Sequence, residues 1–296
     1  MIKSMTGFAS ANGSHQGATW SLEVRAVNGR GLDLRLRVPD WIDGLEAGLR
    51  SQIAAIAARG TVTCALRVAR DEQTGGVTLN VPHLDGVLAA LTSIEAVAKA
   101  HGLTLAPSKA ADIAALRGVL EQSSPDEDTA ALRAHLLSAA EAVLGDFDAM
   151  RTAEGAALAK ILAAQIAEVA QLVESAEGLL EQRSAQMAQA LAANLARVLN
   201  NTEGASSDRV AQELAMIGVK ADVTEELDRL RTHVATARDL LVQGGTIGRK
   251  LDFLIQEFNR EANTLCAKAQ MKELTAVGLS LKAVIDQMRE QVQNVE

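Results

Sequence analysis

The sequence predicts an α+β protein: a small amino-terminal antiparallel β-sheet with helices, then a long-helix region, then a carboxyl-terminal helical bundle. Two patterns predict this class. Within the first eighty residues, apolar and polar residues alternate with the period of half-buried strands. From residue 82 onward, apolar residues recur at the three- and four-residue spacing of helices. The regions expected are residues 1–122, 129–204 and 205–296, with the Ser-Ser-Pro-Asp-Glu-Asp segment at 123–128 as a linker.

The amino-terminal alternation defines the strands of the expected sheet. It predicts four of them, at residues 20–26, 32–38, 62–68 and 77–81. Asn28-Gly29 lies between the first two and is a strong local signal for a tight hairpin. Residues 41–58 have helical spacing instead, so a helix is expected between the second and third strands.

Arginines recur on the polar positions of these strands. They are Arg25, Arg35, Arg37 and Arg67. Since successive side chains of a strand point to opposite faces, all four would share one face if the strands pair in simple register. Arginine binds phosphate, so this face, with Arg35 and Arg37 in particular, is a candidate RNA-binding surface. An ordinary solvated sheet face is the alternative interpretation.

Composition limits the classes of function. The formal net charge of −8 argues against broad non-specific nucleic-acid binding, although it allows a local basic surface. Four Phe, two Trp and no Tyr weaken a model in which RNA bases stack on an aromatic platform. Taken alone, this composition favours a helical scaffold or interaction protein.

Cysteine usage and hydropathy indicate the compartment. Cys64 and Cys266 are far apart and in no metal-ligand spacing, which is typical of reduced cytoplasmic thiols. No run approaches the roughly 20 consecutive apolar residues of a membrane span. The first twenty residues also lack the apolar run of a signal peptide. The expected location is therefore cytoplasmic, with no membrane partner.

An Ala-rich stretch over residues 129–199 predicts a long helix. Its apolar stripe runs from Leu158 to Val198 with a spacing of about 3.6 residues. A helix of about 50 residues would reach roughly 75 Å. Such a helix is too long for its stripe to be buried within one subunit, which predicts a homo-oligomer.

The carboxyl-terminal region predicts an array of helices. They are expected at residues 208–217, 222–242, 247–268 and 272–296. The second and third are joined by a short turn with glycines at Gly244 and Gly245, so they should pack antiparallel. With their apolar seams in contact, a helical wheel places His233 opposite Glu257 and Arg229 opposite Glu261.

This edge of the helix pair is a candidate metal site. Imidazole together with carboxylate suits Zn or Mn, and carboxylate with water suits Mg. Ordinary salt bridges between the helices are the alternative interpretation. At the turn, Arg249, Lys250 and the free N–H groups of the helix start could bind an RNA phosphate, or the segment could be only a glycine-rich turn with solvated bases.

Blocks along the whole chain resemble the YicC/YloC family. The opening Met-Ile-Lys-Ser-Met-Thr-Gly-Phe-Ala is similar to its amino-terminal signature. Further similar blocks are Arg25-Ala26-Val27-Asn28 with Arg30 and Leu32-Asp33-Leu34; Arg209, Gln212-Glu213, Lys220-Ala221-Asp222-Val223, Glu225-Glu226-Leu227, Arg229-Leu230 and His233; Gly248-Arg249-Lys250-Leu251-Asp252-Phe253-Leu254, Gln256-Glu257 and Asn259-Arg260-Glu261-Ala262-Asn263-Thr264; and the ending Arg289-Glu290-Gln291-Val292-Gln293-Asn294-Val295-Glu296.

This resemblance implies a ring-like homohexamer that acts as a divalent-metal-dependent endoribonuclease. It implies Glu226, His233, Glu257 and Glu261 as ligands of a Mn or Mg ion, with the last three catalytic. Arg249, Lys250 and Arg260 are implied as RNA phosphate contacts. The resemblance also implies a link to the turnover of small RNAs, with other ribonucleases as partners that the protein helps.

The chain departs from the family pattern at two places. Gly29 and Gly31 stand where a His and an aromatic residue are usual, and Cys266-Ala267 stands where Gly-Ser is usual.

Two functions remain open at this point. One is metal-dependent endonucleolytic cleavage of single-stranded or hairpin RNA in RNA turnover. The other is a non-catalytic adaptor that binds small RNAs and presents them to another ribonuclease.

Overall fold

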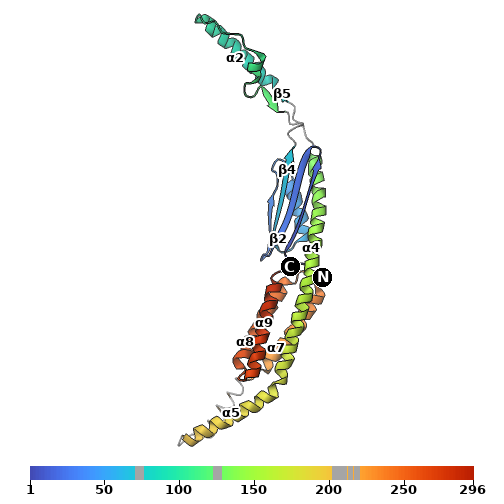
Figure 1. The fold of residues 1–296 in the computed structure, drawn as a ribbon, viewed down its shortest axis with the longest axis vertical. Helices are drawn as coiled ribbons and strands as arrows, with labels where there is room; N and C mark the ends of the chain where they lie inside the picture. Colours follow the sequence, from blue (N-terminus) through green and yellow to red (C-terminus); the bar gives the residue numbers. More distant parts are fainter. Residues whose placement is uncertain (71–76, 123–128, 202–211, 213–215, 217–220) are drawn as a thin grey trace.

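The computed structural model describes the chain except residues 71–76, 123–128, 202–211, 213–215 and 217–220. The molecule is elongated, with a four-stranded sheet at its middle and a helical bundle toward one end (Figure 1). A small unit with two short strands and helix α2 (Val81–Ala100) projects at the other end. Helix α4 (Thr129–Gly178) runs along both the sheet and the bundle. The predicted α+β class is confirmed.

The central sheet is mixed. Its strands are β1 (Gly7–His15), β2 (Ala18–Val27), β3 (Leu32–Arg37) and β4 (Gly60–Arg70), in the order β1-β2-β4-β3. The β1/β2 and β2/β4 pairs are antiparallel, and β3 runs parallel to β4. The sequence predicted a purely antiparallel sheet, and the parallel pairing of β3 with β4 corrects that prediction. The connection from β3 to β4 is helix α1 (Leu45–Ile56), which is shorter than the predicted helix at 41–58.

The predicted hairpin at Asn28-Gly29 is wrong, because β2 and β3 are not neighbours. The tight hairpin lies instead at Gln16 and Gly17, between β1 and β2, where both residues have positive φ (48° and 82°). Positive φ at both central positions is the requirement of a type I′ turn. Strand β1 was not predicted, since its small and polar residues alternate weakly in hydropathy.

Helix α1 and the first part of α4 cover one face of the sheet. The core between them contains Leu22 and Val24 from β2, Leu49 from α1, and Leu136 and Phe147 from α4. All five side chains are almost fully buried. The opposite face of the sheet remains open to solvent in the described part of the chain.

The predicted long helix is divided. Helix α4 ends at Gly178, and α5 (Leu180–Asn201) follows it. Apolar residues of α4 between 132 and 147 pack on the sheet, and those between 158 and 176 pack in the bundle core. The expectation that one subunit cannot bury this stripe is therefore wrong for α4. Its two halves are buried in two different cores of the same chain.

The bundle consists of α4, α7 (Thr224–Gln243), α8 (Gly248–Lys268) and α9 (Lys272–Val292). Helices α7, α8 and α9 agree with the helices predicted at 222–242, 247–268 and 272–296. The turn between α7 and α8 contains Gly244 and Gly245, both with positive φ. The predicted linker at 123–128 lies outside the described residues, as does the predicted helix at 208–217 except for Gln212 and Met216.

The two chain ends meet at the junction of the two cores. Ser4 forms an isolated β-bridge with Val295, and Met5 N donates to Asn294 O. The Glu296 carboxylate accepts hydrogen bonds from Arg151 Nη2 (2.6 Å) and from the backbone N–H groups of residues 58 and 59. Because Arg151 is only 1% exposed, this ion pair is buried.

The projecting unit contains β5 (Val77–Leu79), β6 (Leu120–Gln122), α2 and α3 (Ala110–Ala114). Helix α3 has only five residues. Helix α2 has no buried residue. By length and composition, α2 and α4 could each cross a membrane, although neither has a run of about 20 consecutive apolar residues. For α4 the burial of its stripe in two cores accounts for its apolar character.

Candidate metal centre

The antiparallel pairing of α7 and α8 builds the site. Buried apolar residues of both helices meet in one seam, among them Leu230 and Val234 from α7 and Leu254 and Phe258 from α8. Side chains that flank this seam on the same side of both helices therefore lie opposite one another along its edge. The Arg229 Nη1 atom lies 3.2 Å from Glu261 Oε1, which confirms the pairing expected from the helical wheel.

Three potential ligands converge at this edge. One ligand atom from each of His233, Glu257 and Glu261 lies within 4.8 Å of the other two. Glu261 is buried and the other two are half-buried, so the group lies in a shielded part of the surface. The His233 ring packs edge-on against Phe258, with 5.6 Å between the ring centroids, which restricts its orientation.

His233 Nε2 is the most informative atom of the group. It is buried and has no hydrogen-bond partner among the described residues. A buried ring nitrogen without a partner is costly, and a metal ion would satisfy it. The residues present therefore fit a divalent cation with imidazole and carboxylate ligands.

Arginines surround the group as well. Arg229 is paired with Glu225 and with Glu261, and the hydrogen bond to Glu261 raises the pKa of Arg229 above its usual value. Arg260 Nη1 lies 3.9 Å from Glu257 Oε2. The salt bridges of the alternative interpretation are thus present, but none of them reaches His233 Nε2.

The predicted ligand Glu226 is separated from the other three. It lies seven residues before His233 on α7, about 10 Å along the helix. Its Oε1 accepts a hydrogen bond from Lys268 Nζ at 2.9 Å. The converging group does not include it. Lys268 also donates to the backbone oxygen of Asp222, so its two hydrogen bonds fix the segment just before α7 and the first turn of that helix.

The predicted phosphate contacts of α8 are exposed. Lys250 and Arg260 both lie on the outer surface of the helix. Arg249 Nη2 donates to the backbone oxygen of Arg30 at 3.1 Å. Arg249 and Arg30, together with Arg59, line a cavity of about 280 Å³ where the loop after β2 meets the start of α8. Arg30 and Arg59 were not predicted at this site, because only the fold brings them to it.

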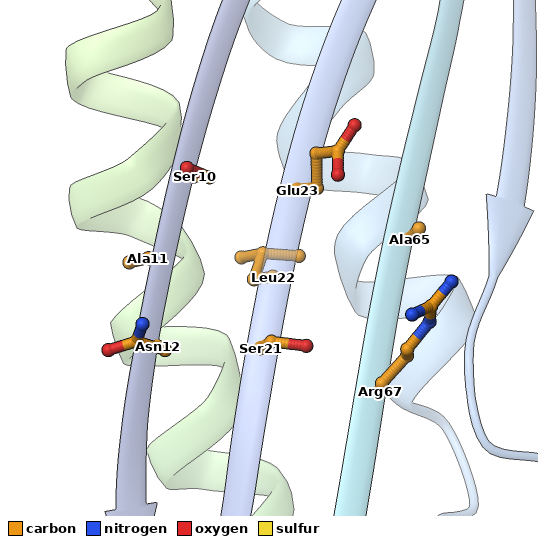
Figure 2. Close-up of a pocket in the computed structure, with 8 residues that line it drawn as sticks. All are labelled: Ser10, Ala11, Asn12, Ser21, Leu22, Glu23, Ala65 and Arg67. Atoms are coloured by element: carbon orange, nitrogen blue, oxygen red, sulfur yellow. The ribbon is translucent and has the colours of Figure 1, made fainter.

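The four sheet arginines share the open face, as predicted from alternation. Arg25 is opposite Thr63 of β4, which is opposite Arg35 of β3. Arg37 and Arg67 lie on the same exposed face. Figure 2 shows the Arg67 side chain beside Ser21 and Glu23, at a hollow of about 510 Å³ on this face. Glu23 and the Asp33–Arg35 ion pair reduce the positive charge of the surface.

Both parts of the chain are similar to known proteins. Residues 2–160 match the family description "Endoribonuclease YicC-like, N-terminal region", and residues 176–296 match "Endoribonuclease YicC-like, C-terminal". The chain belongs to the YicC-like endoribonuclease family. It is 36% identical to "Probable endoribonuclease YicC" of Haemophilus influenzae and 26% identical to the protein of the same name from Clostridioides difficile. Both similarities cover all of this chain and all of the relative.

The family match spans both parts of the molecule described above. The amino-terminal match contains the sheet with its arginine face, and the carboxyl-terminal match contains the α7–α8 pair with the converging ligands. The resemblance predicted from the sequence is thereby confirmed over the whole chain.

Proposed function

We propose that this protein is a divalent-metal-dependent endoribonuclease that cleaves single-stranded or hairpin RNA in RNA turnover. The carrying observation is the convergence of one ligand atom each from His233, Glu257 and Glu261, together with a buried His233 ring nitrogen that has no partner among the described residues. The names of the relatives support RNA as the substrate. A cytoplasmic location belongs to the same proposal.

These three residues would hold the ion, with Mn or Mg as the proposed metal. When bound, such an ion supplies a Lewis acid that stabilises charge on a phosphoryl oxygen or on an attacking oxygen. The chain itself orients the RNA. Arg260 is placed beside Glu257 and would neutralise the phosphate next to the one being cleaved. Arg249 and Lys250 lie in the first turn of the same helix and would bind a neighbouring part of the RNA backbone.

The second candidate is an RNA-binding adaptor without catalysis of its own. The exposed arginine face of the sheet favours it, because that face could bind RNA without any metal. The deciding experiment incubates pure protein with a labelled hairpin RNA, with Mn²⁺ or with chelator. Cleavage that copurifies with the protein and disappears with chelator supports the enzyme. Binding without cleavage in any divalent metal would support the adaptor.

The arginine face has its own prediction. RNA binding is expected to weaken steeply with salt despite the net charge of −8. Each neutralised phosphate contributes about −0.7 to the log–log slope for a single strand. Reversing Arg35 and Arg37 to Glu should flatten the slope by about 1.4. Filter binding between low and moderate salt measures it. An unchanged slope would place the RNA elsewhere on the molecule.

We also propose that the protein is a homo-oligomer, specifically a hexamer. With the α4 stripe buried in its own chain, the support comes from α2, where Leu88, Ile94 and Val97 are all more than two-fifths exposed. Light scattering at micromolar concentration should give several times the chain mass of 31.1 kDa. Replacing Ile94 and Val97 with Lys should reduce that mass. A monomeric wild-type protein would refute the proposal.

A further inference from the structure

The exposure of one aromatic side chain of the bundle is high. Of the four Phe and two Trp, Phe147, Phe258 and Trp20 are buried, while Phe8 is 47% and Trp41 42% exposed. Phe253, on α8, is 63% exposed, more than any other aromatic side chain of the chain. A large apolar ring held in water on a rigid helix loses the stabilisation that burial would give it.

The position of Phe253 is as informative as its exposure. It precedes Glu257 by four residues and follows Arg249 by four residues on the same helix. Residues four apart are neighbours on a helix surface, with their Cβ atoms about 5–6 Å apart. Phe253 therefore lies between the converging metal ligands on one side and Arg249 on the other.

The Arg249 side leads to the cavity that it lines with Arg30 and Arg59. Two of these arginines are held by backbone oxygens: Arg249 by Arg30 O, and Arg59 by Gly29 O at 2.9 Å. Backbone oxygens position a guanidinium without cancelling its charge. Glu296 also lines the cavity, but its carboxylate already accepts hydrogen bonds from Arg151 and from two backbone N–H groups. Positive charge therefore remains for a phosphate.

We infer that Phe253 is a stacking platform for one nucleobase of the RNA, between a phosphate at the metal group and a phosphate at the arginine cavity. This inference rests on the proposed endoribonuclease function and defines its substrate. Glu257 and Arg249 are eight residues apart, about 12 Å along α8. A base that stacks on protein in this interval must be unstacked from its own strand. The RNA at the site is therefore single-stranded, and the ring recognises bases without regard to their sequence.

The test compares three variants at one position. Phe253→Ala removes the ring, Phe253→Leu keeps an apolar side chain without an aromatic face, and Phe253→Tyr keeps the face. Each is titrated with a fluorescent single-stranded RNA oligonucleotide in chelator, so that binding is read by anisotropy without cleavage. A second probe of equal length has a ribose-phosphate backbone without bases. Base stacking on an aromatic residue predicts a loss of affinity of about five- to tenfold or more for Ala.

The expected pattern is specific. Ala and Leu should weaken binding of the RNA, Tyr should restore it, and none of the three should change binding of the abasic probe. Equal affinity of wild type and Ala for the RNA would overturn the inference. So would a changed mass of Phe253→Ala in light scattering, because the ring would then be a contact between subunits. Since the titration needs no metal, wild-type protein that binds but never cleaves would refute the nuclease and leave the stacking result readable.

Discussion

Glu257→Gln and His233→Ala are each expected to abolish metal-dependent RNA cleavage, by more than about a hundredfold, while oligomer size and helical content stay unchanged. Losing even an outer-shell partner of a metal ligand typically costs 10- to 100-fold, and these residues are proposed as direct ligands. Gln keeps the shape of Glu and an acceptor oxygen but loses the charge that a divalent ion requires. Cleavage of labelled RNA in Mn²⁺, with circular dichroism and light scattering beside it, measures the effect.

A matched control is available on the neighbouring helix. Glu290 on α9 is exposed and has no assigned role, so Glu290→Gln should cleave RNA like the wild type. If His233, Glu257 and Glu261 only link two helices, the variants should instead melt at lower temperature and keep their turnover per folded molecule. Exposed ion pairs contribute under about 1 kcal/mol, so the two outcomes are easily separated. Full activity in both variants would rule out this site, though not membership of the family.

Glu296→Ala is expected to lower the free energy of unfolding by about 3–5 kcal/mol, the usual effect of removing one partner of a buried ion pair. It would remove the carboxylate that is hydrogen-bonded to the Arg151 guanidinium, which is 1% exposed, and leave it with the more distant Asp148 carboxylate at 3.9 Å. It would also leave the N–H groups of residues 58 and 59 without their acceptor. Urea denaturation followed by circular dichroism measures the change.

The double variant Arg151→Met, Glu296→Ala tests the cause of that loss. Replacing both members of a buried ion pair with apolar residues is often nearly neutral, so the double variant should recover part of the stability lost in Glu296→Ala. Glu290→Ala, at an exposed position near the same chain end, should denature like the wild type. An unchanged denaturation midpoint for Glu296→Ala would show that the chain ends do not connect the two cores energetically.

The carboxyl-terminal helices and the approach of His233 to Glu257 were determined by the sequence itself. The spacing of apolar residues in an amphipathic helix shows which face is buried. A short turn with glycines then requires two such helices to pack antiparallel. The side chains beside the seam then follow from counting. The family was likewise predictable from the sequence, because its motifs occur in order along the whole chain.

Tertiary structure alone decided the pairing of the strands and the composition of the sites. Strand pairing is non-local: alternation shows which face of a strand is buried but not which strand lies beside it, so β3 pairs parallel with β4 although Asn28-Gly29 suggested a hairpin. The resemblance also implied Glu226 as a ligand, but could not show that it lies about 10 Å from His233 along α7 and accepts a hydrogen bond from Lys268. Arg30, Arg59 and Arg249 meet only because the chain ends join two cores, and no spacing within one helix or strand encodes that contact.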